Sequence, residues 1–180
     1  MRKQRKSTAP SKRAVPRAGL MRRAAVIRCV IFDVDGVITD GKLYLGPDGQ
    51  EWKAVSVRDG LGLRLLLEAG VEVAVISGRP SLAMQTRLNS LGVKHVYLNT
   101  VDKLPAYERV LRDLDLADEQ CAIMGDDTPD LPMMRRAGLT LTVADAHGDV
   151  LAAADWVSRF PGGQGAVREA CDLLLSARSR

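Results

Sequence analysis

Two aspartates follow an apolar run near the start of the chain, in the sequence IRCVIFDVDG. In an extended strand alternate side chains share a face, so Asp33 and Asp35 are expected to lie close together where the strand ends. Gly36 then permits a sharp turn. Neighbouring carboxylates repel each other unless a bound cation, a shared proton or both offset their charge. The spacing therefore indicates such a site, although a plain aspartate-rich turn would give the same short pattern.

A second acidic cluster follows a later apolar run, in the sequence CAIMGDDTPD. It places three aspartates within five residues, and hard oxygen ligands in this arrangement suit Mg²⁺, which takes only a few protein carboxylates. The alternative is a capped turn, in which Asp127 or Thr128 begins the next helix. Both descriptions hold together if one of these residues caps the helix while Asp126 binds the metal.

Ser77 and Lys103 are candidates for binding a phosphate group. Ser77 ends a β-branched run and opens the sequence SGRPS, where a hydroxyl and free backbone N–H groups could cradle a phosphate or simply cap a helix. Lys103 stands at the expected start of a helix, where the helix dipole disfavours a cation. Nearby carboxylates would offset that cost and place Lys103 in the acidic cluster, whereas the alternative is a solvated surface lysine.

These polar residues all follow short apolar strands, and the strands alternate with helices that end at Gly70 and Gly92. Nearly continuous apolar strands of this kind predict a doubly wound, Rossmann-like α/β fold, with a parallel sheet covered on both faces. Ligands of such folds bind beyond the carboxyl ends of the strands. Four polar segments are therefore expected at one edge of the sheet. The sequence GPDG at residues 46–49, between two extended segments, predicts a β-hairpin.

The charge is distributed unevenly along the chain. The 180 residues carry a net charge of +4, but residues 1–23 hold nine Lys or Arg and no acid, which leaves 17 basic and 22 acidic residues in the remainder. We predict a disordered basic tail over residues 1–23 and one domain over residues 24–180. The acidic body and the absence of an aromatic stripe argue against nucleic acid as a partner, even with a basic tail.

Two further features bear on where the protein works. No apolar run approaches the roughly 20 residues that span a bilayer, so no membrane partner is expected. The three cysteines lie in apolar or helical segments without the spacing of a metal site. This is typical of buried, reduced thiols in a cytoplasmic protein.

The ordered set of motifs DVDG, ISGR, DK and GDDTPD, each at an expected strand end, resembles the haloacid dehalogenase superfamily of phosphotransferases. Longer segments resemble its capless branch over about residues 25–177, among them VRDGLGLRLLLEAG, LGVKHVY, VADAH and PGGQGAVREACDLLL. Two positions depart from the usual pattern. Ser77 stands where Thr is common but keeps the hydroxyl, and Gly148 stands where Pro is frequent.

The resemblance implies a Mg²⁺-dependent phosphatase of the lipopolysaccharide sugar pathway. Its first candidate substrate is 3-deoxy-D-manno-octulosonate 8-phosphate, and a nine-carbon sugar-acid phosphate is the alternative. Asp33 would be the nucleophile that forms an aspartyl-phosphate, and Asp35 the general acid and then the base. Ser77 and Lys103 would hold the phosphoryl oxygens. Mg²⁺ would be held by Asp33, the backbone carbonyl of Asp35, and Asp126.

The resemblance also implies a set of contacts to the sugar acid. Arginine recognises carboxylate and phosphate groups with two hydrogen bonds, which fits a substrate that carries both. The alternative for Arg64 and Arg87 is a solvated helix face. The implied substrate-binding residues are Ser56, Val57, Arg58, Asp59, Gly60, Arg64, Gly78, Arg79 and Arg87.

Two more readings concern the class of protein and its assembly. A signalling receiver domain gathers similar groups, but its phosphate-accepting aspartate lies on a middle strand, whereas DVDG lies on the first strand here. A capless phosphatase leaves its site open, and the predicted hairpin is too apolar to stand in water. We expect the hairpins of several copies to pack together in a homotetramer, with the GGQGAVRE segment and Arg168 reaching a neighbour's site. The alternative is a hairpin folded back on its own domain.

Overall fold

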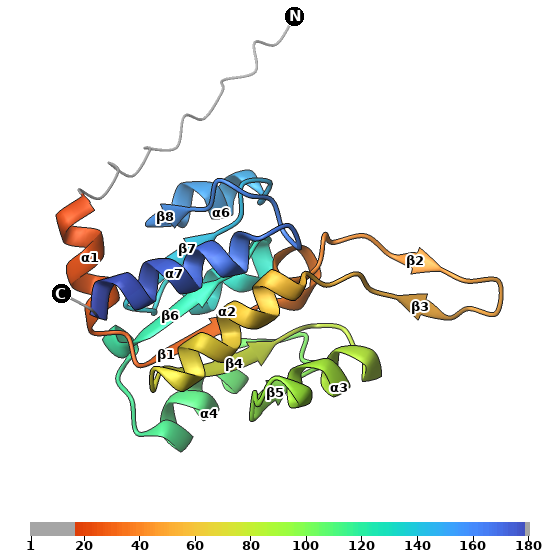
Figure 1. Ribbon diagram of the computed structural model, residues 1–180, viewed down its shortest axis with the longest axis horizontal. Helices are drawn as coiled ribbons and strands as arrows, with labels where there is room; N and C mark the ends of the chain where they lie inside the picture. Colours follow the sequence, from red (N-terminus) through yellow and green to blue (C-terminus); the bar gives the residue numbers. More distant parts are fainter. Residues whose placement is uncertain (1–16, 179–180) are drawn as a thin grey trace, which may run out of the picture.

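A six-stranded parallel sheet forms the centre of the computed structural model, which describes residues 17–178 (Figure 1). The strand order is β5-β4-β1-β6-β7-β8, and every neighbouring pair is parallel. The predicted doubly wound α/β fold is confirmed. The strands are β1 (Cys29–Phe32), β4 (Glu72–Ile76), β5 (His95–Tyr97), β6 (Cys121–Met124), β7 (Leu139–Thr142) and β8 (Trp156–Val157).

The register of the central strands brings their carboxyl ends to one level. Phe32, the last residue of β1, pairs with Val75 of β4 and with Met124 of β6. All four residues of β1 and of β6 are buried, as expected for strands covered on both faces. The polar segments that begin after β1, β4 and β6 therefore start side by side, and they form one edge of the sheet.

Helices cover both faces of the sheet. Figure 1 shows α1 (Arg17–Ala25), α2 (Val57–Glu68) and α7 (Ala166–Arg178) side by side across one face. The connections between successive parallel strands are expected to be right-handed crossovers. They place α3 (Leu82–Ser90) on that face and α4 (Leu104–Leu114), α5 (Leu131–Met134) and α6 (Gly148–Ala153) on the other. Within residues 17–178, no helix is both long and apolar enough to cross a membrane.

The predicted disordered tail over residues 1–23 is wrong for residues 17–23, because these residues belong to helix α1. Leu20 and Ala24 are buried in the core, and α1 packs against α7. Arg23 donates to the Gly138 carbonyl through Nε at 2.6 Å and pairs with Asp155 Oδ2 at 2.7 Å. The basic composition conceals a short helix with one apolar side. Residues 1–16 lie outside the described residues.

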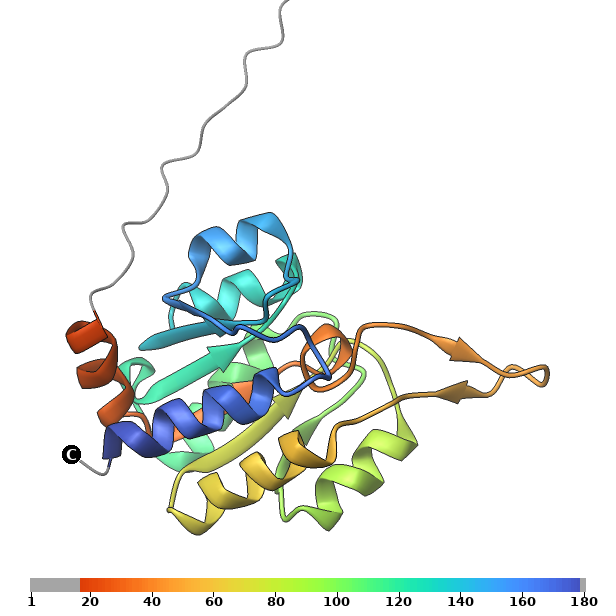
Figure 2. The same cartoon turned by 45° about the horizontal axis from the view of Figure 1, so that its top comes forward.

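The predicted hairpin is present and stands away from the domain (Figures 1 and 2). Its strands, β2 (Tyr44–Leu45) and β3 (Glu51–Trp52), are antiparallel, with Tyr44 opposite Trp52. Leu45 is 69% exposed and Trp52 is 59% exposed, so the hairpin does not fold back on its own domain. Large apolar side chains in such a position are typical of an interaction surface.

Truncation tests the packing of α1. Deleting residues 1–16 is expected to leave the free energy of unfolding unchanged, because that sequence lacks an apolar pattern. Deleting residues 1–25 also removes Leu20 and Ala24 from the core, which should cost about 2–4 kcal/mol. Urea unfolding followed by circular dichroism compares both truncations with the full chain. Equal stabilities of the two truncated proteins would contradict a packed α1.

Candidate active site

A cavity of about 430 Å³ lies at the carboxyl edge of the sheet. Four separate segments contribute to it, those that follow β1, β4, β5 and β6, as the fold predicts. The lining residues are Asp33, Asp35, Gly41, Ser77, Gly78, Arg79, Val101, Lys103, Asp126, Asp127, Pro129 and Asp130. The structure thus brings together all the residues predicted for catalysis and metal binding, with two of the nine predicted substrate contacts.

Lys103 links the nucleophile candidate to the second acidic cluster. Its Nζ lies 2.9 Å from Asp33 Oδ1 and 2.7 Å from Asp130 Oδ1, and its side chain is only 5% exposed. Asp33 Oδ1 has no hydrogen-bond partner, so its contact with Lys103 is an ion pair without hydrogen-bond geometry. Lys103 is therefore a buried cation among carboxylates, and the solvated surface lysine is excluded.

Asp130 organises the acidic loop behind this pair. Its Oδ2 accepts hydrogen bonds from the backbone N–H groups of Asp126 at 3.1 Å and Asp127 at 3.4 Å. Asp127 in turn accepts from the Thr128 N–H at 2.7 Å and begins the short helical turn there. Asp127 thus serves as the cap, while the Asp126 side chain lines the cavity.

The turn after β1 is packed tightly on both sides. Gly36 has φ +89°, and a Cβ there would lie 2.0 Å from Asp126 Oδ2. On its other side, a Cβ on Gly162 would lie 1.8 Å from the Gly36 carbonyl oxygen. The Gly163 N–H also donates to the Val37 carbonyl at 3.0 Å. Glycine at these positions lets Asp126 approach Asp33 more closely than a side chain would permit.

The carboxylates are held where their charges repel. Burial, together with the charge of Asp130 and against that of Lys103, raises the pKa of Asp33 to about 6. Burial and the charges of Asp33 and Asp130 raise the pKa of Asp126 to about 8. Burial disfavours the Lys103 ammonium, but Asp33 and Asp130 outweigh that effect and raise its pKa. The site therefore favours an additional positive charge.

The donor set fits a divalent cation such as Mg²⁺. Asp33, Asp126 and Asp130 each offer an oxygen within 4.8 Å of the others, and no other such group is found within residues 17–178. Asp33 Oδ1 and Asp126 Oδ1 are buried without a hydrogen-bond partner, whereas Asp130 is engaged through both oxygens. Asp33 and Asp126 are thus the carboxylates free to ligate, and hard oxygen donors suit Mg²⁺.

Asp35 faces the same cavity but has different partners. Its Oδ1 pairs with Lys53, and its Oδ2 lies 3.9 Å from Arg79 Nε. Ser77 is nearby and buried, and its Oγ accepts a hydrogen bond from the Arg79 N–H at 3.4 Å. The cap of helix α3 is Ser81 rather than Ser77. The predicted alternative for Ser77, a helix cap, is therefore wrong.

The remaining predicted substrate contacts lie outside this cavity. Asp59 is buried, and its carboxylate accepts the N–H groups of Gly165 at 3.2 Å and Arg168 at 2.8 Å. It caps the start of α7, and its prediction as a substrate contact stays a prediction. Ser56 caps α2, and Gly60 lies against α3 near Arg87. A separate cavity of about 450 Å³ is lined by Val57, Arg58, Leu61, Arg64, Arg87, Ser90 and Leu91.

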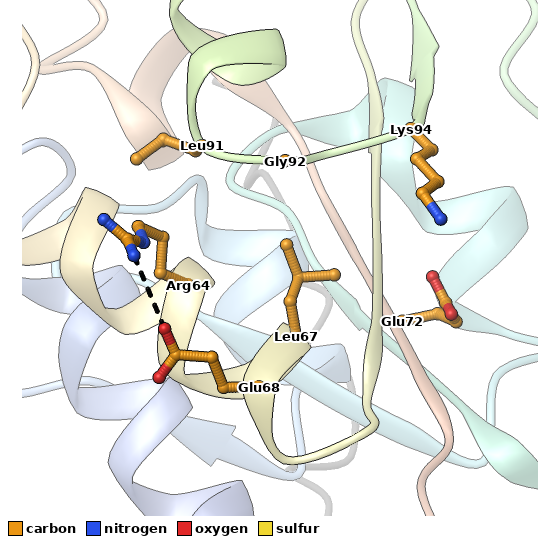
Figure 3. A pocket seen from close by; sticks show the side chains of 7 residues that line it. All are labelled: Arg64, Leu67, Glu68, Glu72, Leu91, Gly92 and Lys94. Carbon is orange, nitrogen blue, oxygen red and sulfur yellow. Dashed lines mark ion pairs between the residues drawn. The ribbon is translucent and has the colours of Figure 1, made fainter.

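A further cavity of about 360 Å³ lies near the start of β4 (Figure 3). Leu67 and Leu91 line it, and Arg64 pairs with Glu68 across its rim at 3.5 Å. None of the residues that line this cavity belongs to the group of possible metal ligands, and none is a carboxylate of the acidic motifs. The residues predicted for catalysis therefore belong to the cavity beside Asp33.

Known proteins are similar to this chain in sequence and in fold. The family model for haloacid dehalogenase-like hydrolase matches residues 95–168. The 3-deoxy-D-manno-octulosonate 8-phosphate phosphatase of Yersinia pestis is 47% identical over 161 residues, which cover 89% of this chain and 86% of that protein. The chain belongs to the family of these phosphatases. Its members are phosphoric monoester hydrolases, and so is this chain.

Solved structures of the family support the metal site. The phosphatase from Moraxella catarrhalis, in complex with a magnesium ion, a phosphate ion and KDO, superposes with a TM-score of 0.89 at 36% identity, covering 91% of this chain and 94% of that one. The cobalt-bound phosphatase from Haemophilus influenzae gives a TM-score of 0.84 at 40% identity, covering 87% and 92%. A receiver domain is thereby excluded.

Sequence reasoning missed Asp130 and Lys53 as parts of the site. Asp130 had a visible signal, because it is the third acid of GDDTPD, but its distance in sequence from Asp126 gave no hint that both oxygens would be engaged. Lys53 gave no signal, since it is one cation in a segment predicted only to form a hairpin. Its contact with Asp35 depends on how the hairpin leaves the domain.

Removal of the metal tests the carboxylate cluster. Because the folded protein raises the pKa of Asp33 to about 6 and of Asp126 to about 8, it binds protons more tightly than the unfolded chain. In metal-free protein their contribution to stability is full below about pH 4 and is lost as the pH rises toward about 8. Mg²⁺ competes with those protons, so it should raise the melting temperature more at about pH 8 than at about pH 5.

Thermal melts with EDTA and with millimolar Mg²⁺ measure this effect. Asp126→Asn should lose most of the Mg²⁺-dependent shift, because one free ligand oxygen and its charge are removed. Asp149→Asn is the matched control, since that carboxylate is exposed on α6. A full Mg²⁺ shift in Asp126→Asn would contradict the assigned ligand.

Proposed function

We propose that this chain hydrolyses 3-deoxy-D-manno-octulosonate 8-phosphate with Mg²⁺, through an aspartyl-phosphate on Asp33. The observation that carries this proposal is Asp33 Oδ1, which is buried without a hydrogen-bond partner, lies 2.9 Å from Lys103 Nζ and is close to the Asp126 carboxylate. An ionised, poorly solvated carboxylate beside a buried ammonium group is an activated nucleophile. The likeness to a phosphatase solved with magnesium, phosphate and KDO supports the same chemistry and substrate.

The first step transfers the phosphoryl group to the protein. A carboxylate oxygen of Asp33 attacks phosphorus, the bond to the sugar oxygen breaks, and Asp35 gives its proton to that oxygen. Ser77 and Lys103 hold the phosphoryl oxygens through their hydroxyl and ammonium groups. Asp33 and Asp126 would hold Mg²⁺, together with the Asp35 backbone carbonyl. When bound, Mg²⁺ neutralises charge on the phosphoryl oxygens.

The second step releases inorganic phosphate. A water molecule attacks phosphorus of the aspartyl-phosphate while Asp35, now ionised, takes its proton. The bond between phosphorus and the Asp33 oxygen breaks, and the carboxylate is restored. Lys103 keeps its ion pair to Asp130 throughout, which fixes the ammonium while Asp33 changes its charge. One residue thus serves as acid and then as base, and the protein returns to its initial state.

Recognition of the sugar acid remains a proposal about several arginines. Arg79 and Gly78 line the cavity directly, which supports their role as contacts to the substrate. Arg58, Arg64 and Arg87 line the separate cavity on α2 and α3, so within one chain they do not meet the phosphate site. We propose that they contact substrate only where a neighbouring copy completes the site. The GGQGAVRE segment and Arg168 are further candidates for such a contact.

We also propose a homotetramer, which the exposed hairpin supports. Leu43, Leu45 and Trp52 stand in water on an arm of two short strands, which is marginally stable by itself. Packing against the hairpins of other copies would bury these side chains and cover a site that has no cap domain. The proposal places the enzyme in the cytoplasm, in agreement with three buried free cysteines.

Phosphate release from a panel of sugar phosphates tests the substrate. The octulosonate 8-phosphate is expected to give the highest kcat/KM, and EDTA is expected to abolish turnover reversibly. A nine-carbon sugar-acid phosphate is the informative competitor, because it carries the same carboxylate on a longer chain. Preference for the longer sugar would overturn the substrate while leaving the mechanism, and activity that resists EDTA would overturn the metal.

Replacement of the nucleophile tests the mechanism. Asp33→Asn is expected to lower kcat by at least about 10⁴-fold, because the amide cannot attack phosphorus. The melting temperature should stay the same or rise, since the substitution removes one of the repelling charges. Asp149→Asn is the control, as its carboxylate is exposed on α6 and does not line the cavity. A folded Asp33→Asn protein with near-normal turnover would refute the assignment.

Disruption of the hairpin surface tests the assembly. Trp52→Lys places a charge on the apolar arm and is expected to convert the tetramer to smaller species and to lower kcat/KM by about tenfold or more, the magnitude of one lost interface anchor. Light scattering at low micromolar concentration gives the oligomeric state. Asp48→Lys, at the tip of the hairpin turn, changes charge without removing an apolar side chain. A fully active monomeric wild type would contradict the proposal.

A further inference from the structure

Lys53 is a buried lysine at the base of an otherwise exposed arm. Its side chain is 2% exposed, whereas its neighbour Trp52 is 59% exposed. A lysine is almost never buried to this extent unless its charge is paired. Lys53 must therefore interact strongly with the groups around it, and one of those groups is Asp35, which lines the active-site cavity.

The ammonium of Lys53 meets two carboxylates. Its Nζ pairs with Asp35 Oδ1 and lies 3.5 Å from Glu51 Oε1. Glu51 also pairs with Arg79 through Oε2 at 2.6 Å, and Arg79 Nε lies 3.9 Å from Asp35 Oδ2. Charges of alternating sign thus form a closed ring that joins the base of the hairpin to the edge of the sheet.

The two oxygens of Asp35 are not equivalent in this ring. Oδ1 accepts the hydrogen bond from Lys53, whereas Oδ2 is buried and has no hydrogen-bond partner. A lysine ammonium has three donors and no acceptor, so the oxygen it contacts must remain an acceptor. A proton carried by Asp35 is therefore expected on Oδ2, the oxygen that accepts no hydrogen bond.

We propose that Lys53 is a positioning residue that fixes the rotation of the Asp35 carboxyl group and reserves Oδ2 for proton transfer. This rests on the proposed function in that Asp35 acts as acid and base. The Oδ2 proton passes to the sugar oxygen as its bond to phosphorus breaks and Asp33 bonds to phosphorus. Oδ2 then takes a proton from the attacking water as the Asp33–phosphorus bond breaks.

The ring also ties the hairpin to catalysis. Lys53 and Glu51 both lie on the second strand of the arm or directly after it. Whatever holds the arm in place also holds the Asp35 carboxyl group in its working orientation. The loss of alignment by a fraction of an ångström is enough to slow proton transfer, because the donor must lie within hydrogen-bond reach of the leaving oxygen.

The dependence on the leaving group tests the proposal. An alkyl phosphate needs a proton on its departing oxygen, whereas p-nitrophenolate departs without one. Lys53→Met should therefore lower kcat/KM for alkyl phosphates, the octulosonate phosphate among them, by about 10- to 100-fold, and for p-nitrophenyl phosphate by less than about threefold. This ratio reports only the steps up to departure of the leaving group, so it does not include hydrolysis of the aspartyl-phosphate, in which Asp35 acts as base for every substrate. Lys53→Arg should restore most of the alkyl rate, because it keeps a charged donor.

Lys42→Met is the matched control. It removes an exposed cation from the segment that leads into β2, and it should act like wild type on both substrates. Equal loss of kcat/KM on alkyl and p-nitrophenyl esters, or no loss, would overturn the proposal. If Lys53→Met fails to fold, Lys53→Gln keeps a neutral donor and must show the same selective loss, only smaller. Hydrolysis of alkyl phosphates but not of the octulosonate phosphate by wild type would sink the proposed substrate and leave the Lys53 test intact.

Discussion

Repulsion among buried carboxylates is the constraint on which the rest of the site depends. Asp33, Asp126 and Asp130 have oxygens within 4.8 Å of one another, in surroundings that desolvate them. One lysine offsets part of this charge, and two backbone N–H groups fix Asp130. A divalent cation can neutralise the remaining negative charge. A phosphoryl group can then bind between this cation and Lys103. The site is thus most stable when it is loaded, and its geometry is fixed before the ligand arrives.

The backbone around the site explains how such repulsion is sustained. The Gly36 turn lies between the Asp126 carboxylate and Gly162, with no room for a side chain on either contact. Gly162 is held by the Asp145 carboxylate at 3.0 Å, and the segment behind it is held by Asp59 at the start of α7. Asp59 is buried, and burial raises its pKa, so it serves the scaffold at some cost. The last helix of the chain thereby supports the turn that follows the first strand.

The sequence predicts the fold and the central cluster because both follow from local patterns. Apolar strands with polar ends place Asp33, Ser77, Lys103 and Asp126 at one edge whatever the details of packing. What fails depends on tertiary contacts that composition hides. Residues 17–23 read as a basic tail, yet Leu20 packs into the core. Nothing in the sequence indicates that the Asp59 carboxylate caps α7. The contact of Lys53 with Asp35 could not be predicted for the same reason, because it depends on the path of the hairpin.

The central claim is that Asp33 carries the phosphoryl group between the two steps. Rapid quenching in acid during turnover of the octulosonate phosphate, followed by proteolysis and peptide mass spectrometry, measures it most directly. The account predicts that the peptide containing Asp33 gains the mass of one phosphoryl group early in the reaction and loses it as substrate is exhausted. Borohydride reduction of the same sample should convert Asp33, and not Asp35, to homoserine. An unmodified Asp33 peptide during active turnover, or a phosphoryl group on another residue, would contradict the account.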